Sequence, residues 1–523
     1  MSRPVLGIDL GTTNSVVASI DGQGRIVILR NALGNEITPS VVFFEPGSGV
    51  VVGEEALQAA AAEPGSGVRL IKRQMGTQFP LMLGGQEHTP ESVSALILRQ
   101  LASDAPGGLA GRPRVVITVP AYFGLAEREA TYQAGVIAGL DVLELLDEPV
   151  AAAAHYGLAT TGTRTVLVYD LGGVTFDTTV LQITDGVVTV LATDGHHQLG
   201  GADVDQRLLD LVLERLEHRI PPAEFDAFAE DGRRVSTLAL DVEVAKKELS
   251  ARTSRDVVVR TSTGRVTVTV SRGDLEAACG DLFDTTAEII DRVLASARSA
   301  GAKEIDDVVM VGGSSRIPAL SARLTSLLGI TPRLVEPDLA VAKGAALRAH
   351  QILATPQLAA LTRSAGRPAA ARAGGITTVA PRAMGILVED SHDPSGARSF
   401  VEHLIQANTP LPVSRTEERF GTIVSHQESV RIQVYEQAGS SPSAEVAHNR
   451  RVLDGELTQL GALPAGSVIR ITVKIAIDGR LTVIAHEPVS GRELTLEAFV
   501  EGVVDSVETE RLTRVVGMTT VRG

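Results

Sequence analysis

Two short stretches of the chain place an aspartate at the end of an apolar strand and follow it with a turn of small residues. The first reads DLGTT, Asp9–Thr13, and the second reads DLGGVTFD, Asp170–Asp177. Glycine lets the backbone approach a ligand closely, and the N–H groups of such a turn can surround an anion. A carboxylate beside an anion needs a cation between them, and Mg²⁺ prefers a few protein oxygens together with waters and phosphates. The two turns therefore predict a site for the phosphate chain of a nucleotide.

Both turns lie in a longer internal repeat. Val5–Leu29 and Val166–Leu191 each contain a strand, Asp-Leu-Gly, a loop of small residues, a second strand, an Asp-Gly turn and a third strand. Asp9 and Asp170 are 170 − 9 = 161 positions apart. Such a duplication predicts two halves of similar design that face each other across a cleft. For either stretch alone, an ordinary hairpin turn is the alternative.

A third candidate element is VVMVGGSSRIP, Val308–Pro318, an apolar strand that enters a helix through the pair Gly312–Gly313. The glycines allow a flat ligand to approach, and a helix N-terminus favours negative charge, although many ordinary turns share this pattern. The motifs GxxxxGK[ST], GxGxxG, GxSxG and HExxH do not occur in the sequence. His196 and His197 are adjacent in a loop, and we interpret them as solvated turn residues rather than ligands.

The elements that must position these residues divide the chain into four parts. Strands alternate with helical stretches over residues 1–353, which predicts an α/β domain. Residues 354–375 are rich in Ala, Gly, Pro and Thr and predict a polar linker. Short alternating segments over residues 376–498 predict an all-β domain. Residues 499–523 predict a short tail with one amphipathic helix and no helical lid.

Composition excludes several function classes. The chain has 523 residues and a net charge of −15, which does not suit a nucleic-acid backbone. One cysteine, Cys279, excludes a disulfide framework within the chain and favours a reducing, cytoplasmic compartment. No apolar run reaches 18 residues, and the N-terminus has no signal-peptide pattern, so we expect no membrane association.

The motifs together resemble the DnaK family, the seventy-kilodalton heat-shock chaperones. Matching strings run through the first 350 residues, and a weaker match continues beyond them. They are GIDLGTTNS (Gly7–Ser15), IKRQMG (Ile71–Gly76), ITVPAYF (Ile117–Phe123), EPVAAA (Glu148–Ala153), DLGGVTFD, LGGADVD (Leu199–Asp205), KKELS (Lys246–Ser250), VGGSSRIP, PDLAVAKGAA (Pro337–Ala346), VAPRAMGI (Val379–Ile386), ANTPLP (Ala407–Pro412) and DGRLTV (Asp478–Val483).

The resemblance implies an actin-like, two-lobed ATPase domain followed by a β-sandwich, with ATP or ADP and Mg²⁺ as cofactors and K⁺ as a further candidate. It implies that Asp9 and Asp170 hold Mg²⁺ through water. It also implies that Lys72, Glu148, Asp170, Thr175 and Asp177 are catalytic. The residues implied in nucleotide binding are Asp9, Gly11, Thr12, Thr13, Asn14, Gly172, Gly173, Gly200, Gly201, Glu243, Lys246, Ser250, Gly312, Gly313, Ser314, Arg316 and Asp338.

The all-β domain resembles the peptide-binding domain of the same family, which implies extended apolar segments of unfolded clients as partners. The candidates for its apolar pocket are Ile386, Val388, Phe420, Ile423, Val430 and Ile432. For each of them, a place in the core of the sandwich is an equal alternative.

The sequence departs from the family pattern in four ways. Val174 replaces a glycine, and its bulk is expected to point toward the phosphates. Glu144 replaces a basic residue that receives a J-domain cochaperone, and shortened outer segments weaken the case for an exchange factor. The polar linker makes docking of the linker doubtful, and the lid is missing. Two alternatives to a chaperone ATPase therefore remain: an ATP-binding sensor with little turnover, and a scaffold for one dedicated partner.

Overall fold

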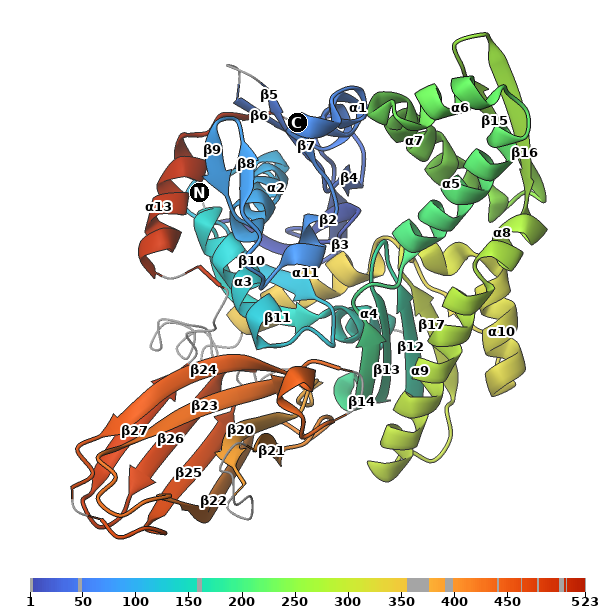
Figure 1. Cartoon of the computed structure of the whole chain (residues 1–523). Coiled ribbons are helices and arrows are strands. Elements are labelled where there is room, and N and C mark those ends of the chain that lie inside the picture. Colours follow the sequence, from blue (N-terminus) through green and yellow to red (C-terminus); the bar gives the residue numbers. More distant parts are fainter. Residues whose placement is uncertain are drawn as a thin grey trace.

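The computed structural model describes residues 3–45, 49–157, 162–354, 376–390, 398–439, 442–461, 463–476, 479–497, 503–504 and 506–522 (Figure 1). The predicted linker, residues 354–375, lies outside them except for Ala354. Of the described helices, none is both long and apolar enough to cross a bilayer.

The first lobe is built on a sheet with the strand order β11-β10-β1-β2-β3. These strands are β11 (Asp141–Asp147), β10 (Arg114–Val119), β1 (Val5–Asp9), β2 (Asn14–Ile20) and β3 (Ile26–Leu29), and β4 (Thr38–Pro39) pairs with β2 outside this path. β1 and β11 run parallel to β10, whereas β2 is antiparallel to both β1 and β3. The apolar runs of β1 and β10 are buried, so the DLGTT turn lies at the end of a rigid central strand.

The second lobe repeats this design in the order β18-β17-β12-β13-β14, with β19 added at the edge. The strands are β18 (Arg333–Leu334), β17 (Asp307–Val311), β12 (Thr163–Leu171), β13 (Phe176–Thr184), β14 (Val187–His196) and β19 (Ile376–Thr377). Strand directions match those of the first lobe, since β12 is antiparallel to β13 and parallel to β17. The internal repeat seen in the sequence is therefore a repeat of topology, and it places Asp9 and Asp170 at equivalent strand ends.

Two helices lie between the sheets. They are α4 (Glu148–Gly157) and α11 (Ala340–Ala354), and their apolar residues share one core with β10, β12 and β17. A Cβ on Gly344 would lie 1.9 Å from the carbonyl oxygen of Ala151, and one on Gly7 would lie 2.0 Å from the amide nitrogen of Ala346. Glycine at these positions is what lets α11 approach both α4 and β1.

The remaining helices cover the outside of the lobes (Figure 1). On the first lobe are α1 (Glu54–Ala62), α2 (Pro90–Asp104) and α3 (Leu125–Ile137), beside a smaller sheet that contains β5 (Val42–Glu45), β6 (Gly49–Val52) and β7 (Gly67–Val68). A hairpin, β8 (Leu81–Leu83) and β9 (Gln86–His88), lies on the same lobe. On the second lobe are α5 (Gly201–Glu217), α6 (Pro222–Ala229), α7 (Gly232–Leu249), α8 (Arg272–Ala278), α9 (Gly280–Ser299), α10 (Pro318–Leu328) and the hairpin β15 (Ser254–Arg260) with β16 (Arg265–Ser271).

The β-sandwich consists of two four-stranded antiparallel sheets, β21-β20-β23-β24 and β22-β25-β26-β27. The strands are β20 (Met384–Glu389), β21 (Ser399–Ile405), β22 (Val413–Gly421), β23 (Ser429–Gln437), β24 (Asn449–Thr458), β25 (Val468–Ile475), β26 (Leu481–Glu487) and β27 (Arg492–Glu497). Alternate residues of both sheets, such as Val434 and Val473, point into one shared core.

The chain leaves the sandwich and returns to the first lobe. The tail helix α13 (Ser506–Met518) packs on α2 and α3, and β28 (Val521–Arg522) pairs with β6 in parallel. The two termini therefore lie on the same lobe (Figure 1). The sequence predicts one helix in the tail, but it gives no sign that the tail returns to the first lobe.

The chain docks on the second lobe directly after the predicted linker. Ile376 and Thr377 form β19, which pairs with Val188 and Thr189 of β14, and Val379 is buried. The doubt about docking concerned residues 354–375, which lie outside the described residues except for Ala354, so it stays a prediction. Backbone pairing does not require apolar side chains, so a polar composition does not prevent it.

Candidate functional site

A cavity of about 480 Å³ opens between the two lobes, and both Asp-Leu-Gly turns line it. The glycine pair of the third candidate element lines its far side. Predicted site residues on the wall are Asp9, Gly11, Thr12, Thr13, Asn14, Lys72, Glu148, Asp170, Gly172, Gly173, Thr175, Glu243, Lys246, Gly312, Gly313, Ser314, Arg316 and Asp338. The volume is in the range of a small-molecule site.

Glycines allow close approach at three points of the cavity wall, and at one of them, Gly173, the two turns meet. A Cβ on Gly173 would lie 1.8 Å from Oγ1 of Thr13, and a Cβ on Gly11 would lie 1.9 Å from the carbonyl oxygen of Asn14. Gly312 has a φ of +81°, and a Cβ there would lie 2.5 Å from Oδ1 of Asp170. These positions accept no side chain, so the backbone of both turns faces the cavity directly.

A cluster of buried acidic side chains lies at the base of the cavity. Burial raises the pKa of Asp9 to about 7, and the neighbouring Glu148 carboxylate adds to this shift. Burial, followed by the charges of Glu148 and Asp9, raises the pKa of Asp170 well above its usual value. Burial also raises the pKa of Asp177, whose Oδ2 has no hydrogen-bond partner. The carboxyl groups cannot all ionise without additional positive charge nearby.

Lys72 supplies one positive charge to this cluster. Its Nζ donates to Oε1 of Glu148 at 2.7 Å, and both side chains are at most 10% exposed. The ammonium also lies 5.7 Å from the centre of the Phe123 ring. One cation among four carboxyl groups leaves a deficit of positive charge, which a divalent cation would correct.

The donor set fits a Mg²⁺ ion held through water. Within the described part of the chain, no three His, Cys, Asp or Glu side chains form a group that could hold a metal directly. Asp9 and Asp170 nevertheless face the same cavity from opposite lobes. Because Mg²⁺ keeps several of its waters, two carboxylates beside a phosphate site are a suitable environment for it.

A second group of polar side chains lies on the second lobe. Lys246 is buried, and its Nζ donates to the carbonyl oxygen of Gly201 at 3.0 Å and to Oδ2 of Asp205 at 2.8 Å. Arg316 forms an ion pair with Asp338. Such side chains could contact the base and the ribose of a nucleotide.

Glu243 connects the two lobes. It lies on α7 of the second lobe, and its carboxylate pairs with Arg69 of the first lobe at 3.1 Å and with Lys247 at 2.8 Å. A second ion pair between the lobes joins Arg73 to Asp203 at 3.0 Å. Glu243 therefore has partners of its own, in addition to its place on the wall of the cavity.

Four of the predicted site residues do not line this cavity. Gly200 packs against the backbone of Val174, and the carbonyl oxygen of Gly201 accepts from Lys246. Ser250 lies at the end of α7, and Asp177 lies behind the wall with Oδ1 accepting from the Tyr122 amide. Sequence reasoning also missed residues that do line it, namely Val16, Ile37, Ala202, Asp205, Lys247, Pro337 and Val341. Five of them stand in strings that resemble the family: Ala202 and Asp205 in LGGADVD, Lys247 in KKELS, and Pro337 and Val341 in PDLAVAKGAA.

One expectation about departures from the family pattern is wrong. Val174 is fully buried, its φ is not positive, and it does not line the cavity, so its bulk is not directed at a bound phosphate there. Glu144 is 8% exposed, and its Oε2 accepts from Nε of Arg348 at 2.8 Å. The position that has a basic residue in the family pattern is therefore part of a buried ion pair, and a J-domain cochaperone stays in doubt.

The six candidates for the peptide pocket separate into three groups. Ile386 and Ile432 are 4% and 5% exposed and belong to the sandwich core, so they present almost no surface to a peptide. Val388, Phe420 and Val430 are half-buried and pack against that core. Ile423 is 59% exposed, as is the adjacent Val424 at 58%. Alternation along the strands sends Ile386 and Ile432 inward, and this is the alternative that the sequence left open.

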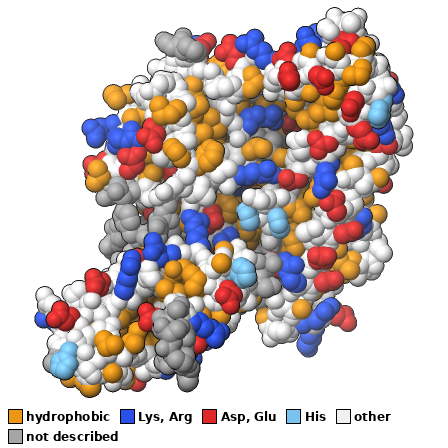
Figure 2. All heavy atoms as spheres, viewed as in Figure 1, with side chains coloured by type: hydrophobic (Ala, Val, Ile, Leu, Met, Phe, Trp, Pro, Cys, Tyr) orange, Lys and Arg blue, Asp and Glu red, His pale blue; other side chains and the backbone are white. Residues whose placement is uncertain are grey.

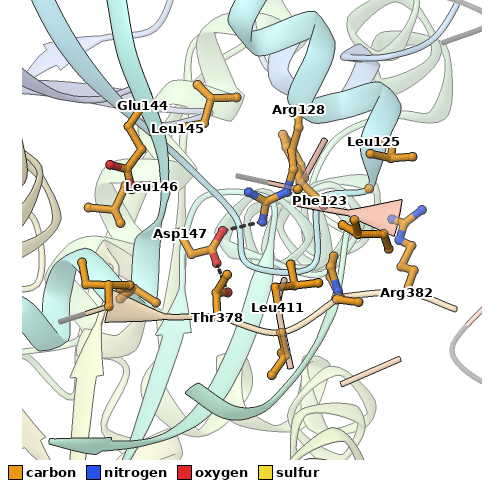
Figure 3. A pocket seen from close by; sticks show the side chains of 18 of the residues that line it. Phe123, Leu125, Arg128, Glu144, Leu145, Leu146, Asp147, Thr378, Arg382 and Leu411 are labelled. Carbon is orange, nitrogen blue, oxygen red and sulfur yellow. Dashed lines mark hydrogen bonds and ion pairs between the residues drawn. The ribbon is translucent and has the colours of Figure 1, made fainter. Parts of the chain in front are cut away.

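A second cavity lies where the sandwich meets the first lobe (Figure 3). Asp147 is at its centre, forming an ion pair with Arg128 and accepting a hydrogen bond from Thr378 at 3.1 Å. Leu411 from the sandwich and Phe123 from the first lobe also line it. Its volume of about 50 Å³ is too small for a nucleotide, and it marks the contact between the two domains.

Comparisons with known proteins agree with this geometry. The family model described as Hsp70 protein matches residues 5–82 and 77–518. The chain is 37% identical over 507 residues to the chaperone protein DnaK of Thermotoga neapolitana, which covers 94% of this chain and 80% of that relative. It is 35% identical over 544 residues to the chaperone protein DnaK of Deinococcus deserti, with 97% and 81% covered. The similarity therefore extends over both lobes, the sandwich and α13.

Proposed function

The chain belongs to the Hsp70 family and is a DnaK-like molecular chaperone with ATPase activity, and we propose that the cavity between its two actin-like lobes is where ATP is bound and hydrolysed. The observation that carries this proposal is the meeting of the two Asp-Leu-Gly turns around one cavity, with Lys72 and buried carboxyl groups at its base. An actin-like cleft of this kind requires two equivalent strand ends, and the repeated topology supplies them.

In this proposal the residues of the cleft divide the work of phosphoryl transfer. When bound, Mg²⁺ neutralises phosphate charge, and Asp9 and Asp170 would hold its waters. Lys72 places a fixed positive charge where negative charge develops in the transition state. Glu148 would orient the attacking water, and Thr175 would lie next to it. Asp177 does not line the cavity, so it would contribute from behind the wall, next to Glu148. Lys72, Glu148 and Asp170 are buried, and the low dielectric around them strengthens these interactions.

The cation deficit of the cleft supports a dependence on Mg²⁺. Buried carboxyl groups with raised pKa values hold protons that a divalent cation would displace. K⁺ is a further candidate for the same region. The side chains of Lys246, Ser314, Arg316 and Asp338 would select adenosine, and Glu243 would close that side of the cleft.

The sandwich would bind extended apolar peptide segments. Ile423 and Val424 supply exposed apolar surface at the end of β22, and Phe420 and Val430 lie behind them. We place this activity in the cytoplasm. A J-domain cochaperone remains a candidate partner only if it avoids Glu144, because that carboxylate is already paired with Arg348. An exchange factor would have to act on the outer parts of both lobes.

Calorimetric titration tests the nucleotide site. We expect ATP and ADP to bind in the presence of Mg²⁺, GTP to bind at least tenfold more weakly, and EDTA to reduce ATP affinity. Equal affinity for GTP, or no effect of EDTA, would contradict the assignment of the cleft. Turnover with and without an apolar peptide then tests the sensor alternative, which predicts ATP binding without hydrolysis. Val174 does not line the cavity, so its bulk gives that alternative no support.

A further inference from the structure

The carboxyl-terminal segment 506–522 is bound to the first lobe by two kinds of contact. Leu512 and Val516 of α13 are fully buried and belong to the same core as α2 and α3. Oγ1 of Thr509 donates to Oε1 of Gln133 on α3 at 3.2 Å. The segment therefore contributes to the core of the first lobe, and it makes no comparable contribution to the sandwich from which it emerges (Figure 1).

Strand β28 adds a backbone attachment. Val521 pairs with Val50 and Arg522 with Val51, and the Val50 amide donates to the carbonyl oxygen of Thr520 at 3.0 Å. Gly49 has a φ of +108°, and a Cβ there would lie 2.7 Å from that same carbonyl oxygen. Arg522 also forms an ion pair with Glu45. The match to the Hsp70 family model ends at residue 518, so this strand lies beyond it.

The surface that the sandwich presents to the first lobe is mixed, because buried polar contacts lie beside an apolar part in which Leu125 and Ala126 of α3 share one core with the sandwich. Oε1 of Glu436 accepts from the Leu125 amide at 3.1 Å, at the N-terminus of α3, where a carboxylate is favoured. A Cβ on Gly124 would lie 2.3 Å from that carboxylate, so only glycine allows this approach. Arg450 pairs with Glu127 at 3.5 Å and donates to the carbonyl oxygen of Gly76.

The sandwich also contacts the second lobe. The amide of Thr193 donates to Oδ1 of Asn408 at 2.8 Å, and β19 pairs with β14. Acidic and basic side chains are interspersed over the exposed face shown in Figure 2. Domains of one chain move relative to each other by default unless their interface is large and hydrophobic, and this interface is mixed.

We propose that segment 506–522 is a second anchor, which keeps the sandwich docked on the first lobe whatever nucleotide occupies the cleft. The sandwich is held on its amino-terminal side by β19 and on its carboxyl-terminal side by α13 and β28. Val503 lies between β27 and α13, and it packs against the cores of both the first lobe and the sandwich.

The length of the connection sets the range of movement. Residues 498–505 join β27 to α13, and a fully extended chain of that length spans roughly 30 Å. A domain on so short a tether has an effective concentration in the mM range at its docking surface. A sandwich that separates therefore rebinds the first lobe, and its mixed interface does not need to be strong.

Pulsed electron resonance with spin labels at Gln23→Cys and Val489→Cys measures docking directly. Both positions are exposed, one on the first lobe and one on the sandwich, whereas the native Cys279 is buried. We expect one narrow distance distribution without nucleotide, with ADP and with ATP. The double variant Leu512→Asp/Val516→Asp should show a separated population at least tenfold larger. The matched control is Val507→Asp/Met518→Asp, on the exposed side of the same helix, and it should remain docked.

A second variant keeps every contact of the anchor. Insertion of a 30-residue Gly/Ser segment within residues 498–502 lengthens the tether and leaves Leu512 and Val516 in place. We expect it to release the sandwich as the double variant does, with the first lobe still folded by circular dichroism. A native chain that separates in ADP as fully as these variants overturns the proposal, and so do variants that stay docked. Because docking is also measured without nucleotide, the result does not depend on ATP hydrolysis.

Discussion

Lys72 and Glu148 form the pair on which the chemistry of the cleft depends. The ammonium is buried 2.7 Å from the carboxylate, and no large movement is needed for it to face a phosphate in the same cavity. Fixed charges in a buried site act mainly on the transition state, where charge is redistributed, and less on the bound ground state. The pair should therefore matter more for the rate of hydrolysis than for affinity.

Replacement of this lysine tests that distinction. Lys72→Met should lower kcat on the order of 100-fold and change the Kd for ATP far less, since it removes charge but keeps the aliphatic stem. Single-turnover hydrolysis and calorimetric titration give the two quantities. Lys303→Met, at an exposed lysine far along the chain, is the control. A loss of binding with unchanged turnover of the bound fraction would contradict this role.

Thr175→Ala is a second test of the same distinction. We expect it, like Lys72→Met, to lower kcat far more than it raises the Kd for ATP.

Gly173 is the residue where the two phosphate loops are closest. A Cβ there would lie 1.8 Å from Oγ1 of Thr13, so Gly173→Ala must push the two turns apart. We expect ATP affinity to fall at least tenfold, about 1.4 kcal/mol, as measured by titration. Gly280→Ala is the matched control, because a Cβ at that position meets no atom within 4 Å. Unchanged affinity in Gly173→Ala would show that the turns do not approach each other in the bound state.

Among the elements, α8 shows how a short helix is held in place on the second lobe. Ser271 and Asp274 form its capping box, and Asp274 also pairs with Arg215 of α5 at 2.6 Å. The hydrogen bond from Arg215, together with those from Ser271, lowers the pKa of Asp274 to about 2. A carboxyl whose folded pKa is lowered stabilises the fold above its unfolded value, near 3.8, and loses this effect as the pH falls toward 2.

Asp274→Asn should therefore lower local stability at neutral pH. We expect the free energy of opening of α8 to fall by about 1–2 kcal/mol at pH 7, a value that allows for the partial exposure of the ion pair. The difference from the native chain should shrink below pH 4. Hydrogen exchange of the α8 amides from pH 3 to 7, corrected for intrinsic rates, measures it. Asp281→Asn, at a more exposed ion pair, is the control and should have little effect. A difference that grows on acidification would contradict the role of this carboxylate.

For the whole molecule, the exchange of peptide reports whether the domains communicate. The sandwich is docked from both sides, and no helix covers it among the described residues (Figure 1). Because no helix covers the sandwich, a bound peptide meets no steric barrier when it dissociates. Because the sandwich stays docked, nucleotide has no second domain arrangement through which to change peptide affinity. Release of a fluorescent apolar peptide should therefore be fast and should differ less than tenfold between ATP and ADP. Stopped-flow release measures it, and a larger difference, above about 1.4 kcal/mol of coupling, would show that the domains communicate.

The sequence by itself determined the parts that depend on local patterns. The repeat around Asp9 and Asp170 predicts two matching sheets, because buried strands and tight turns are encoded by neighbouring residues. The motifs also point to most of the residues that line the cleft. Alternation marks the strands of the sandwich, but it does not say which face of β20 or β23 is inside, so Ile386 and Ile432 stayed undecided.

Only the tertiary structure decided the features that depend on contacts between distant segments. Val174 is fully buried and does not line the cleft, and the sequence around it does not encode where its side chain lies. Glu144 forms a buried ion pair with Arg348, which is 204 positions away in the sequence. The tail returns to β6 by backbone pairing, which leaves almost no signature in side-chain types. Long-range packing and pairing of this kind follow from the assembled fold, since the partners meet only after both lobes have formed.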